Sequence, residues 1–417
     1  MRGMIHRTCV LSVVLLLAGS VWAQGLPPAA TPWKTLFDGS STADWVAYGK
    51  GVFPAKGWTI EGDALHISAN AGGGDLRSVG EFSDFELRFS WKVAAGANSG
   101  VIYRSKEGEA ACWVTGPEYQ VLDDAGHGDG KEPKTAAGGL YAVHAAEGKA
   151  LAAVGQWNEA RIVARGNMVE HWLNGVRVVQ ALIGSDDWNA RVASSKWKDA
   201  AKYAKSTKGH IVLQDHGDAV WFKDIRIREF TGGDVALFDG KSFDGWKRFI
   251  PGVENPATWS INEGILQCSG KPSGYIRTVA THTNYILRLD WRFNPDAAGN
   301  SGVLVRQIED DKVWPRSIEA QLQSGRAGDF WNIGDFVMKA AADRTNGRNT
   351  RATSTNEKPL GEWNSYEIEV DGPVVELRVN GKVLNVATDC AIVAGHICLQ
   401  SEGVPISFRN IRVTPLP

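Results

Sequence analysis

A small set of polar side chains in this 417-residue sequence is spaced so that strands could bring them to one face of a β-sheet. Glu118 and Gln120 are two residues apart and share a face if their segment is a strand. Asn98 opens a nearby apolar run, and alternation along that run places Arg104 on the face opposite to Val101. A carboxylate, two amides and a guanidinium on neighbouring strands could bind a polar ligand or transfer protons. The simpler alternative is an Arg–Glu ion pair that only stabilises the sheet.

Histidine and aspartate residues near these strands are further candidates for acid–base chemistry. Gln214 and His216 follow an apolar segment, so the imidazole would reach a sheet edge or the mouth of a cleft, although a single His is more often structural. His144 follows a glycine-containing turn. Asp123 and His127 lie in a loop with a second aspartate. This loop could bind a divalent cation, although a solvated loop is the simpler interpretation.

Several well-known catalytic motifs are missing from the sequence. There is no Gly-x-x-x-x-Gly-Lys-Ser/Thr phosphate loop and no Gly-x-Ser-x-Gly nucleophile turn. Glu118 is followed two residues later by Gln120 rather than by a second carboxylate. The strand therefore lacks the paired acids of a laminarinase-type glycosidase.

The same motifs return in the second half of the chain, in the same order. Glu118 and Glu319, for example, are 201 residues apart, and a period of this length indicates two copies of one domain rather than a solenoid. We predict domains at residues 34–231 and 235–417. The counterparts of Asn98, Arg104, Glu118, Gln120 and Gln214 are Asn300, Arg306, Glu319, Gln321 and Gln400. The second copy has Glu402 where the first has His216.

The elements that must position these residues are strands. Residues 85–91 and 285–293 alternate apolar and polar side chains at a period of two, and Asn174-Gly175 lies between two such segments as a hairpin turn. Many short strands in a domain of this size predict a β-sandwich, and we expect two tandem jelly rolls of the concanavalin A-like, lectin or glucanase type. The first copy has an insertion at residues 185–208, which we expect to be partly helical and to lie near a rim.

The net charge and the N-terminal sequence limit the cellular locations and the partners that we expect for the protein. The formal net charge is −2, which gives no indication of nucleic acid or of an anionic membrane as partner. Residues 1–23 have a basic start, a short apolar segment and a small-x-small cleavage pattern, so we expect an exported, periplasmic or secreted protein without a membrane span. The cysteines that follow form neither a disulfide framework nor a zinc pattern, and buried free thiols are expected.

Taken together, the motifs resemble the 3-keto-disaccharide hydrolase family, also described as 3-keto-glucoside 1,2-lyases and 3-keto-2-hydroxy-glucal hydratases. The resemblance covers both copies. It rests on Phe37-Asp38-Gly39 with Trp45, Asn98-Ser99-Gly100 with Arg104, Glu118-Tyr119-Gln120, Gly209-His210-Ile211, Leu213-Gln214-Asp215-His216-Gly217 and Phe222-Lys223-Asp224-Ile225-Arg226. It implies a concanavalin A-like fold and a carbohydrate substrate that already carries a ketone at C3, supplied by an upstream sugar dehydrogenase or oxidase.

The resemblance also implies a chemistry that does not need paired acids. Removal of the C2 proton beside the ketone gives an enediolate, the glycosidic oxygen leaves C1, and water can then add. Catalysis is expected from His216 and Glu118, with His144 and Asp123 as further candidates. A divalent metal at the enediolate is conceivable. Substrate binding is expected from Asn98, Arg104, Gln120, Gln214, Asn300, Arg306, Glu319, Gln321 and Gln400. The alternative is a non-catalytic glycan-binding protein with two lectin-like modules.

Overall fold

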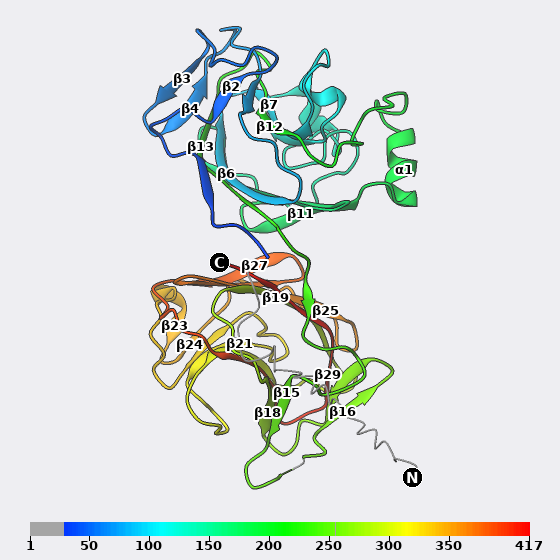
Figure 1. Ribbon diagram of the computed structural model, residues 1–417, viewed down its shortest axis with the longest axis vertical. Coiled ribbons are helices and arrows are strands. Elements are labelled where there is room, and N and C mark those ends of the chain that lie inside the picture. The colour runs from blue at the N-terminus through cyan, green and yellow to red at the C-terminus, as the bar shows by residue number, and fades with distance from the viewer. Residues whose placement is uncertain (1–28, 255) are drawn as a thin grey trace, which may run out of the picture.

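The computed structural model describes residues 29–254 and 256–417, so the predicted export signal at residues 1–23 lies outside the described part. The chain forms two β-sandwiches, one in each half of the sequence, which meet at a waist (Figure 1). We call them the N-terminal and the C-terminal sandwich. In the described residues, no helix combines the length and the apolar character needed to cross a bilayer.

The large sheets of the two sandwiches continue into each other as one 16-stranded sheet. In the N-terminal sandwich its strands are β1 (Lys34–Phe37), β3 (Trp58–Glu61), β4 (Ala64–Ile67), β6 (Phe85–Val93), β9 (Asn158–Arg165), β10 (Met168–Leu173), β11 (Val176–Leu182) and β13 (Val220–Glu229). In the C-terminal sandwich they are β14 (Val235–Ala236), β16 (Trp259–Asn262), β17 (Ile265–Cys268), β19 (Tyr285–Phe293), β25 (Asn364–Asp371), β26 (Val374–Val379), β27 (Lys382–Ala387) and β29 (Ile406–Pro415).

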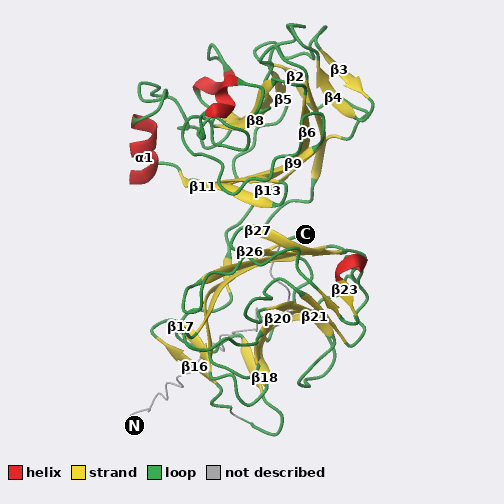
Figure 2. Ribbon diagram, turned by 180° about the vertical axis from the view of Figure 1, so that it is seen from behind, coloured by secondary structure: helices red, strands yellow, loops and turns green. Residues whose placement is uncertain are grey.

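A second, smaller sheet closes each sandwich. The N-terminal one has five strands, β2 (Trp45–Ala47), β5 (Leu76–Ser78), β7 (Asn98–Ser105), β8 (Glu118–Leu122) and β12 (His210–Leu213). The C-terminal one has eight, β15 (Trp246–Phe249), β18 (Gly274–Thr278), β20 (Gly302–Gln307), β21 (Ser317–Gln321), β22 (Phe330–Ile333), β23 (Thr345–Asn346), β24 (Asn349–Thr350) and β28 (His396–Ser401). The all-β sandwich prediction is confirmed. Figure 2 shows how little of the described part of the chain is helical. Its helices are η2 (Cys112–Val114), η3 (Gly128–Lys131), α1 (Asp186–Ala193) and η4 (Ala342–Arg344).

Alternation along the strands explains the packing. In β6, alternate side chains are buried and half-exposed along most of the strand, as its period-two pattern predicts. Asn174 and Gly175 both have positive φ angles, 47° and 76°, which is the geometry of the tight hairpin turn between β10 and β11. Inward side chains of both sheets form one core in each sandwich, with Trp91 and Trp291 fully buried.

The predicted insertion contains helix α1. Ser185 caps this helix, because its side-chain oxygen accepts a hydrogen bond from the backbone N–H of Trp188. Trp197 stacks on Tyr203 with ring centroids 4.4 Å apart and an interplanar angle of 6°. Helix α1 confirms the partly helical character of the insertion, and these buried aromatic rings fix its remaining part beside the smaller sheet of the N-terminal sandwich.

The waist combines strand pairing with a buried ionic network. β11 pairs with β27, so the hairpin of one sandwich extends the sheet of the other. Fully buried Glu86 accepts from Arg161 and Arg228 at 2.7 and 2.5 Å, and Arg228 also reaches Glu369 of the other sandwich at 2.7 Å. Burial alone would raise the pKa of Glu86, but the surrounding guanidinium groups hold it well below its usual value. The two sandwiches therefore share charges that neither could bury alone.

The four cysteines in the described residues are all free and buried, as expected from their spacing.

Candidate active site

The outer face of the five-stranded sheet of the N-terminal sandwich carries a cavity of about 370 Å³. Asn98, Glu118, Gln120 and Gln214 line it, from β7, β8 and the end of β12. Their strand neighbours, such as Tyr119, point into the core instead. Period-two alternation thus brings together residues that are up to 116 positions apart in the sequence, 214 against 98.

Glu118 lies over a glycine of the neighbouring strand. A Cβ atom at Gly100 would stand 2.1 Å from Oε1 of Glu118, so only glycine leaves room for this carboxyl group. Burial raises the pKa of Glu118 to about 8, although Lys196 counteracts part of this effect. Glu118 is therefore mostly protonated at neutral pH and can donate a proton or a hydrogen bond.

His216 lines the same cavity, at the turn that follows β12. The turn is held by Asp215, whose carboxylate accepts hydrogen bonds from the backbone N–H groups of Gly74 and Gly217 at 2.8 and 3.1 Å. The ring of His127 lies 6.3 Å from that of His216, edge to face. The expectation that His216 reaches a cleft is confirmed, and it shares that cleft with Glu118.

The insertion supplies two further residues that sequence reasoning missed. Lys196 and Trp197 line the cavity, and the Lys196 ammonium lies 3.9 Å from the ring centroid of Tyr141. Burial lowers the pKa of Lys196, and Glu118 opposes that shift. The Tyr141 hydroxyl donates to Asp129 at 2.8 Å, which orients this wall of the cavity. Because the insertion occurs in one copy only, comparison of the copies did not single out these residues.

A solvent-exposed tryptophan stands beside each of the two equivalent strands. Trp113 lines the cavity, is 43% exposed and lies 6.0 Å from Trp197. Trp314, 201 residues later, is also 43% exposed. Each precedes the strand glutamate, Glu118 or Glu319, by five residues. Exposed indole faces are suited to stacking against sugar rings. The repetition of this tryptophan in the sequence is the signal that could have revealed it.

Arg104 does not belong to the cavity, and the expectation that it would is wrong. Its φ angle is 53° and the pairing of β12 with β7 has a register shift nearby, so alternation breaks at this residue. The guanidinium instead donates to the backbone oxygens of Ser83 and Gly166 at 2.8 and 2.9 Å and to Asp84 at 3.2 Å. Arg306 has the same φ angle and likewise donates to backbone oxygens. Both arginines stabilise loops.

Asp123 and His144 also lie outside the residues that line the cavity. Asp123 accepts hydrogen bonds from the backbone N–H groups of Gly96 and Ala125 at 2.7 and 3.1 Å, which makes it a loop anchor. The ring of His144 lies 6.2 Å from that of Trp188, and burial lowers the pKa of this histidine. Both were expected as further catalytic candidates, but in the structure their contacts are with loop backbone and with a buried tryptophan.

Two side chains of the suggested cation loop make contacts within the protein. Asp124 pairs with Lys149, and Nδ1 of His127 accepts a hydrogen bond from the backbone N–H of Asp129. In residues 29–254 and 256–417, no three His, Cys, Asp or Glu side chains cluster closely enough to hold a metal ion.

The C-terminal sandwich repeats the site with a different acid–base set. A Cβ atom at Gly302 would lie 2.3 Å from Oε1 of Glu319 and 2.6 Å from Oε1 of Gln400, so the glycine has the same role as Gly100. Burial raises the pKa of Glu319 to about 8, and the nearby Glu402 adds to this shift. The backbones of Asn300 and Glu402 form an isolated antiparallel β-bridge.

The Gln321 side chain is held at the end of its own strand, because its Oε1 accepts hydrogen bonds from the backbone N–H groups of Leu322 and Gln323 at 2.9 and 3.0 Å. Gln120 instead donates to the Asn98 side chain at 3.3 Å. The two sites therefore share a framework but differ in the contacts of this glutamine and in the residue at the position of His216.

Comparison with known proteins identifies the family. The profile of the 3-keto-alpha-glucoside-1,2-lyase-like domain matches residues 32–228 and 233–414, which together make up most of the chain. The chain belongs to this family. A 3-keto-disaccharide hydrolase of Bacteroides thetaiotaomicron is 32% identical over 233 residues, which are 49% of this chain and 80% of that protein.

Several solved structures are each similar to about half of the chain. A protein from Parabacteroides distasonis that has been assigned as a glycosyl hydrolase is 33% identical to this chain. The TM-score is 0.44, and the match covers 47% of this chain and 93% of that one. A β-glucanase of Bacillus licheniformis is 12% identical, with a TM-score of 0.30 over 44% of this chain and 99% of that one. The family membership makes the chain a carbohydrate-active enzyme of the glycoside hydrolase type, built from concanavalin A-like sandwiches.

Proposed function

We propose that the N-terminal sandwich cleaves 3-keto-glycosides by elimination across C1 and C2, and that water addition at C1 can complete a net hydrolysis. The observation that carries this proposal is the cavity that a histidine, a mostly protonated carboxyl group and a lysine ammonium group line together. Such a set can remove one proton, deliver another and stabilise a negative oxygen. The names of the family and of the Bacteroides relative support a 3-keto substrate.

The first step breaks the C2–H bond. The imidazole of His216 takes the proton, and the electron pair forms the C2–C3 double bond of an enediolate, with negative charge on the C3 oxygen. Lys196 replaces Arg104 as the cation for this oxygen, because the lysine lines the cavity and the arginine does not. A donor of this kind contributes roughly 10²–10³ in rate. Asn98 and Gln214 are placed to bind hydroxyl groups.

The second step breaks the bond between C1 and the glycosidic oxygen. The C3 carbonyl re-forms, the electron pair moves to a C1–C2 double bond, and protonated Glu118 delivers its proton to the leaving oxygen. A carboxyl group with a pKa of about 8 holds that proton at neutral pH, whereas an ordinary glutamate would not. Trp113 and Trp197 form one wall of the cavity, where they can stack on the leaving sugar.

The C-terminal sandwich is proposed to bind glycan without this elimination. Glu402 occupies the sequence position of His216, and burial raises the pKa of Glu402 as well as that of Glu319. The imidazole of the first site is thus replaced by a carboxyl group whose burial favours its neutral form. Trp314 keeps the exposed stacking face.

The proposed reaction needs a second enzyme that supplies its substrate, and it is proposed to take place outside the cytoplasm. The C3 ketone must be made by a separate sugar oxidoreductase, because a neutral C2–H without an adjacent carbonyl is not acidic enough for a histidine. The protein is proposed to work after export, in keeping with the basic and apolar start of its sequence.

The test compares a 3-keto-glucoside with its unoxidised parent. We expect cleavage of the ketone form only, with release of the intact alcohol. In D₂O, recovered substrate or product should carry deuterium at C2, and in H₂¹⁸O the label should enter at C1 and not the released alcohol. Cleavage of the unoxidised glycoside, or label in the alcohol, contradicts elimination at C1.

Two variants localise the chemistry. His216→Ala should lower turnover by roughly 10²–10⁴-fold, since it removes the base, and should leave the melting temperature nearly unchanged. His66→Ala is a matched control, because His66 stacks on Trp221 with centroids 4.5 Å apart and does not line the cavity. Retained turnover in His216→Ala, with a lower melting temperature, would show that His216 is structural.

A further inference from the structure

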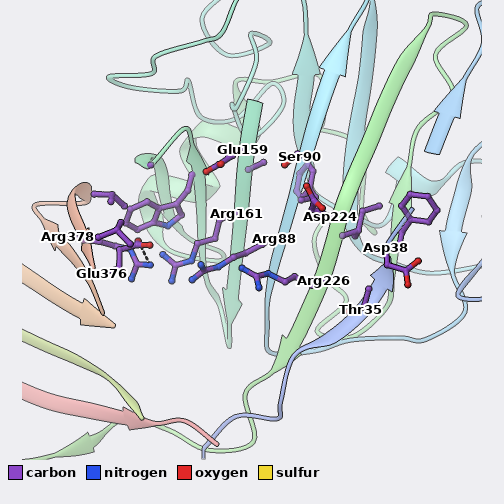
Figure 3. A pocket seen from close by; sticks show the side chains of 18 residues that line it. Thr35, Asp38, Arg88, Ser90, Glu159, Arg161, Asp224, Arg226, Glu376 and Arg378 are labelled. Carbon is purple, nitrogen blue, oxygen red and sulfur yellow. Dashed lines mark ion pairs between the residues drawn. The ribbon is translucent and has the colours of Figure 1, made fainter. Parts of the chain in front are cut away.

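A second and larger cavity, of about 620 Å³, lies at the waist between the two sandwiches (Figure 3). Its walls are the outer face of the large sheet of the N-terminal sandwich and the hairpin β26–β27 of the C-terminal one. No residue that lines it also lines the candidate active site. Cavities at domain interfaces are common ligand sites.

Three arginines cross this sheet face in one row. Arg161, Arg88 and Arg226 occupy directly paired positions on β9, β6 and β13, and all three line the cavity (Figure 3). Like charges opposite each other on adjacent strands repel unless an anion neutralises them. Arg161 and Arg88 both donate to Glu86 at 2.7 Å.

Arg226, at the end of the row, has a different environment. No carboxylate pairs with it within residues 29–254 and 256–417. Its guanidinium instead lies 4.8 Å from the centroid of the Trp33 ring. It is exposed, so its donors are open to a ligand in the cavity.

The C-terminal sandwich contains an equivalent pair of arginines with a bound carboxylate. Arg288 and Arg412 are cross-strand partners on β19 and β29, at the positions that correspond to Arg88 and Arg226. Both bind Asp234, at 3.3 and 2.8 Å from its carboxylate oxygens. In that half of the molecule a carboxylate of the chain itself neutralises the pair.

We propose that the waist cavity binds the carboxylate of an acidic sugar, a hexuronate, through Arg226. The carboxylate would take the place that Asp234 has beside the other arginine pair. The cavity is much larger than one ion, and Ser90, Glu159 and Asp224 around it offer partners for hydroxyl groups (Figure 3). This site is separate from the proposed elimination site and does not depend on it.

The test is titration calorimetry of the full chain with glucuronate, glucose and inorganic phosphate at low and high salt. We expect saturable binding of one glucuronate, at least tenfold tighter than glucose or phosphate and weakened by salt. Arg226→Gln should weaken glucuronate binding at least tenfold. Arg292→Gln is the matched control, because Arg292 also lies over a tryptophan, 4.6 Å from the Trp363 centroid, and lines neither cavity.

Each other outcome overturns the proposal. Absence of glucuronate binding at millimolar concentration rules out the site. Equal binding of glucose shows that the carboxylate is not recognised, and equal binding of phosphate assigns the site to simple anions. Glucuronate binding that Arg226→Gln leaves unchanged places the ligand elsewhere, including the candidate active site.

Discussion

Replacement of Glu118 by glutamine should make the protein more stable at neutral and alkaline pH while it strongly reduces catalysis. Burial raises the pKa of this carboxyl group from 4.5 to about 8. The unfolded chain ionises Glu118 near pH 4.5, so the folded state loses stability as the pH rises from about 4.5 to about 8. At 1.36 kcal/mol per pKa unit, the full loss is about 5 kcal/mol above pH 8 and about 3 kcal/mol at pH 7.

Glutamine at position 118 keeps the shape of the side chain but cannot ionise. Urea unfolding at pH 4, 7 and 9 should therefore show Glu118→Gln equal to the wild type at pH 4, with a growing advantage at pH 7 and 9. The same variant should lose roughly 10²–10⁴-fold in kcat/KM on a 3-keto-glucoside, because it cannot deliver a proton. Stability and activity would thus change in opposite directions.

Glu319→Gln is the matched control from the other sandwich. Burial also raises the pKa of Glu319 to about 8, so this variant should show the same stability profile with activity retained. The reasoning is refuted if Glu118→Gln has the wild-type pH dependence of stability, or if it is less stable than the wild type at pH 9.

Further predictions concern single side chains. Arg104→Ala should lower the unfolding free energy by about 3 kcal/mol, because it removes buried hydrogen bonds, and should leave KM unchanged. An altered KM would show that Arg104 contributes to substrate binding. Gly100→Ala should reduce turnover at least tenfold, because its Cβ displaces the Glu118 carboxyl group, and full activity would contradict this packing. Lys196→Met should lower kcat by roughly 10²-fold and change KM little, whereas the reverse pattern would make it a binding residue. Trp113→Ala should raise KM roughly tenfold for a 3-keto-disaccharide but not for a methyl 3-keto-glucoside, and equal changes would exclude stacking on the leaving sugar.

Much of the fold and part of the site could be predicted because they follow from local periodicity. The alternation in residues 85–91 and 285–293 predicted strands, and the Asn-Gly pair at 174 predicted a hairpin. The same two-residue period placed Glu118 and Gln120 on one face, and both line the cavity. These patterns depend on neighbouring residues only, so one sequence is sufficient to read them.

Arg104 shows where this reasoning stops. A one-residue irregularity with a φ angle of 53° reverses the face of every later side chain in the strand, and neither the run nor its composition signals it. Lys196 shows the complementary failure. It enters the cavity because stacked aromatic rings fix a 24-residue insertion, at residues 185–208, against the sheet.

By itself, the sequence determined the repeat, because the same motifs return in the same order. It also determined the strands, the turns and the faces on which most polar side chains lie, since each of these depends on residues a few positions apart. Tertiary structure alone decided that His216 and Glu118 line one cavity, that Lys196 of the insertion lines it while Arg104 does not, and that arginines of both sandwiches converge at the waist. These outcomes depend on burial, on charge neutralisation and on close approach between segments that are far apart in the sequence. Such contacts arise only when whole sheets pack.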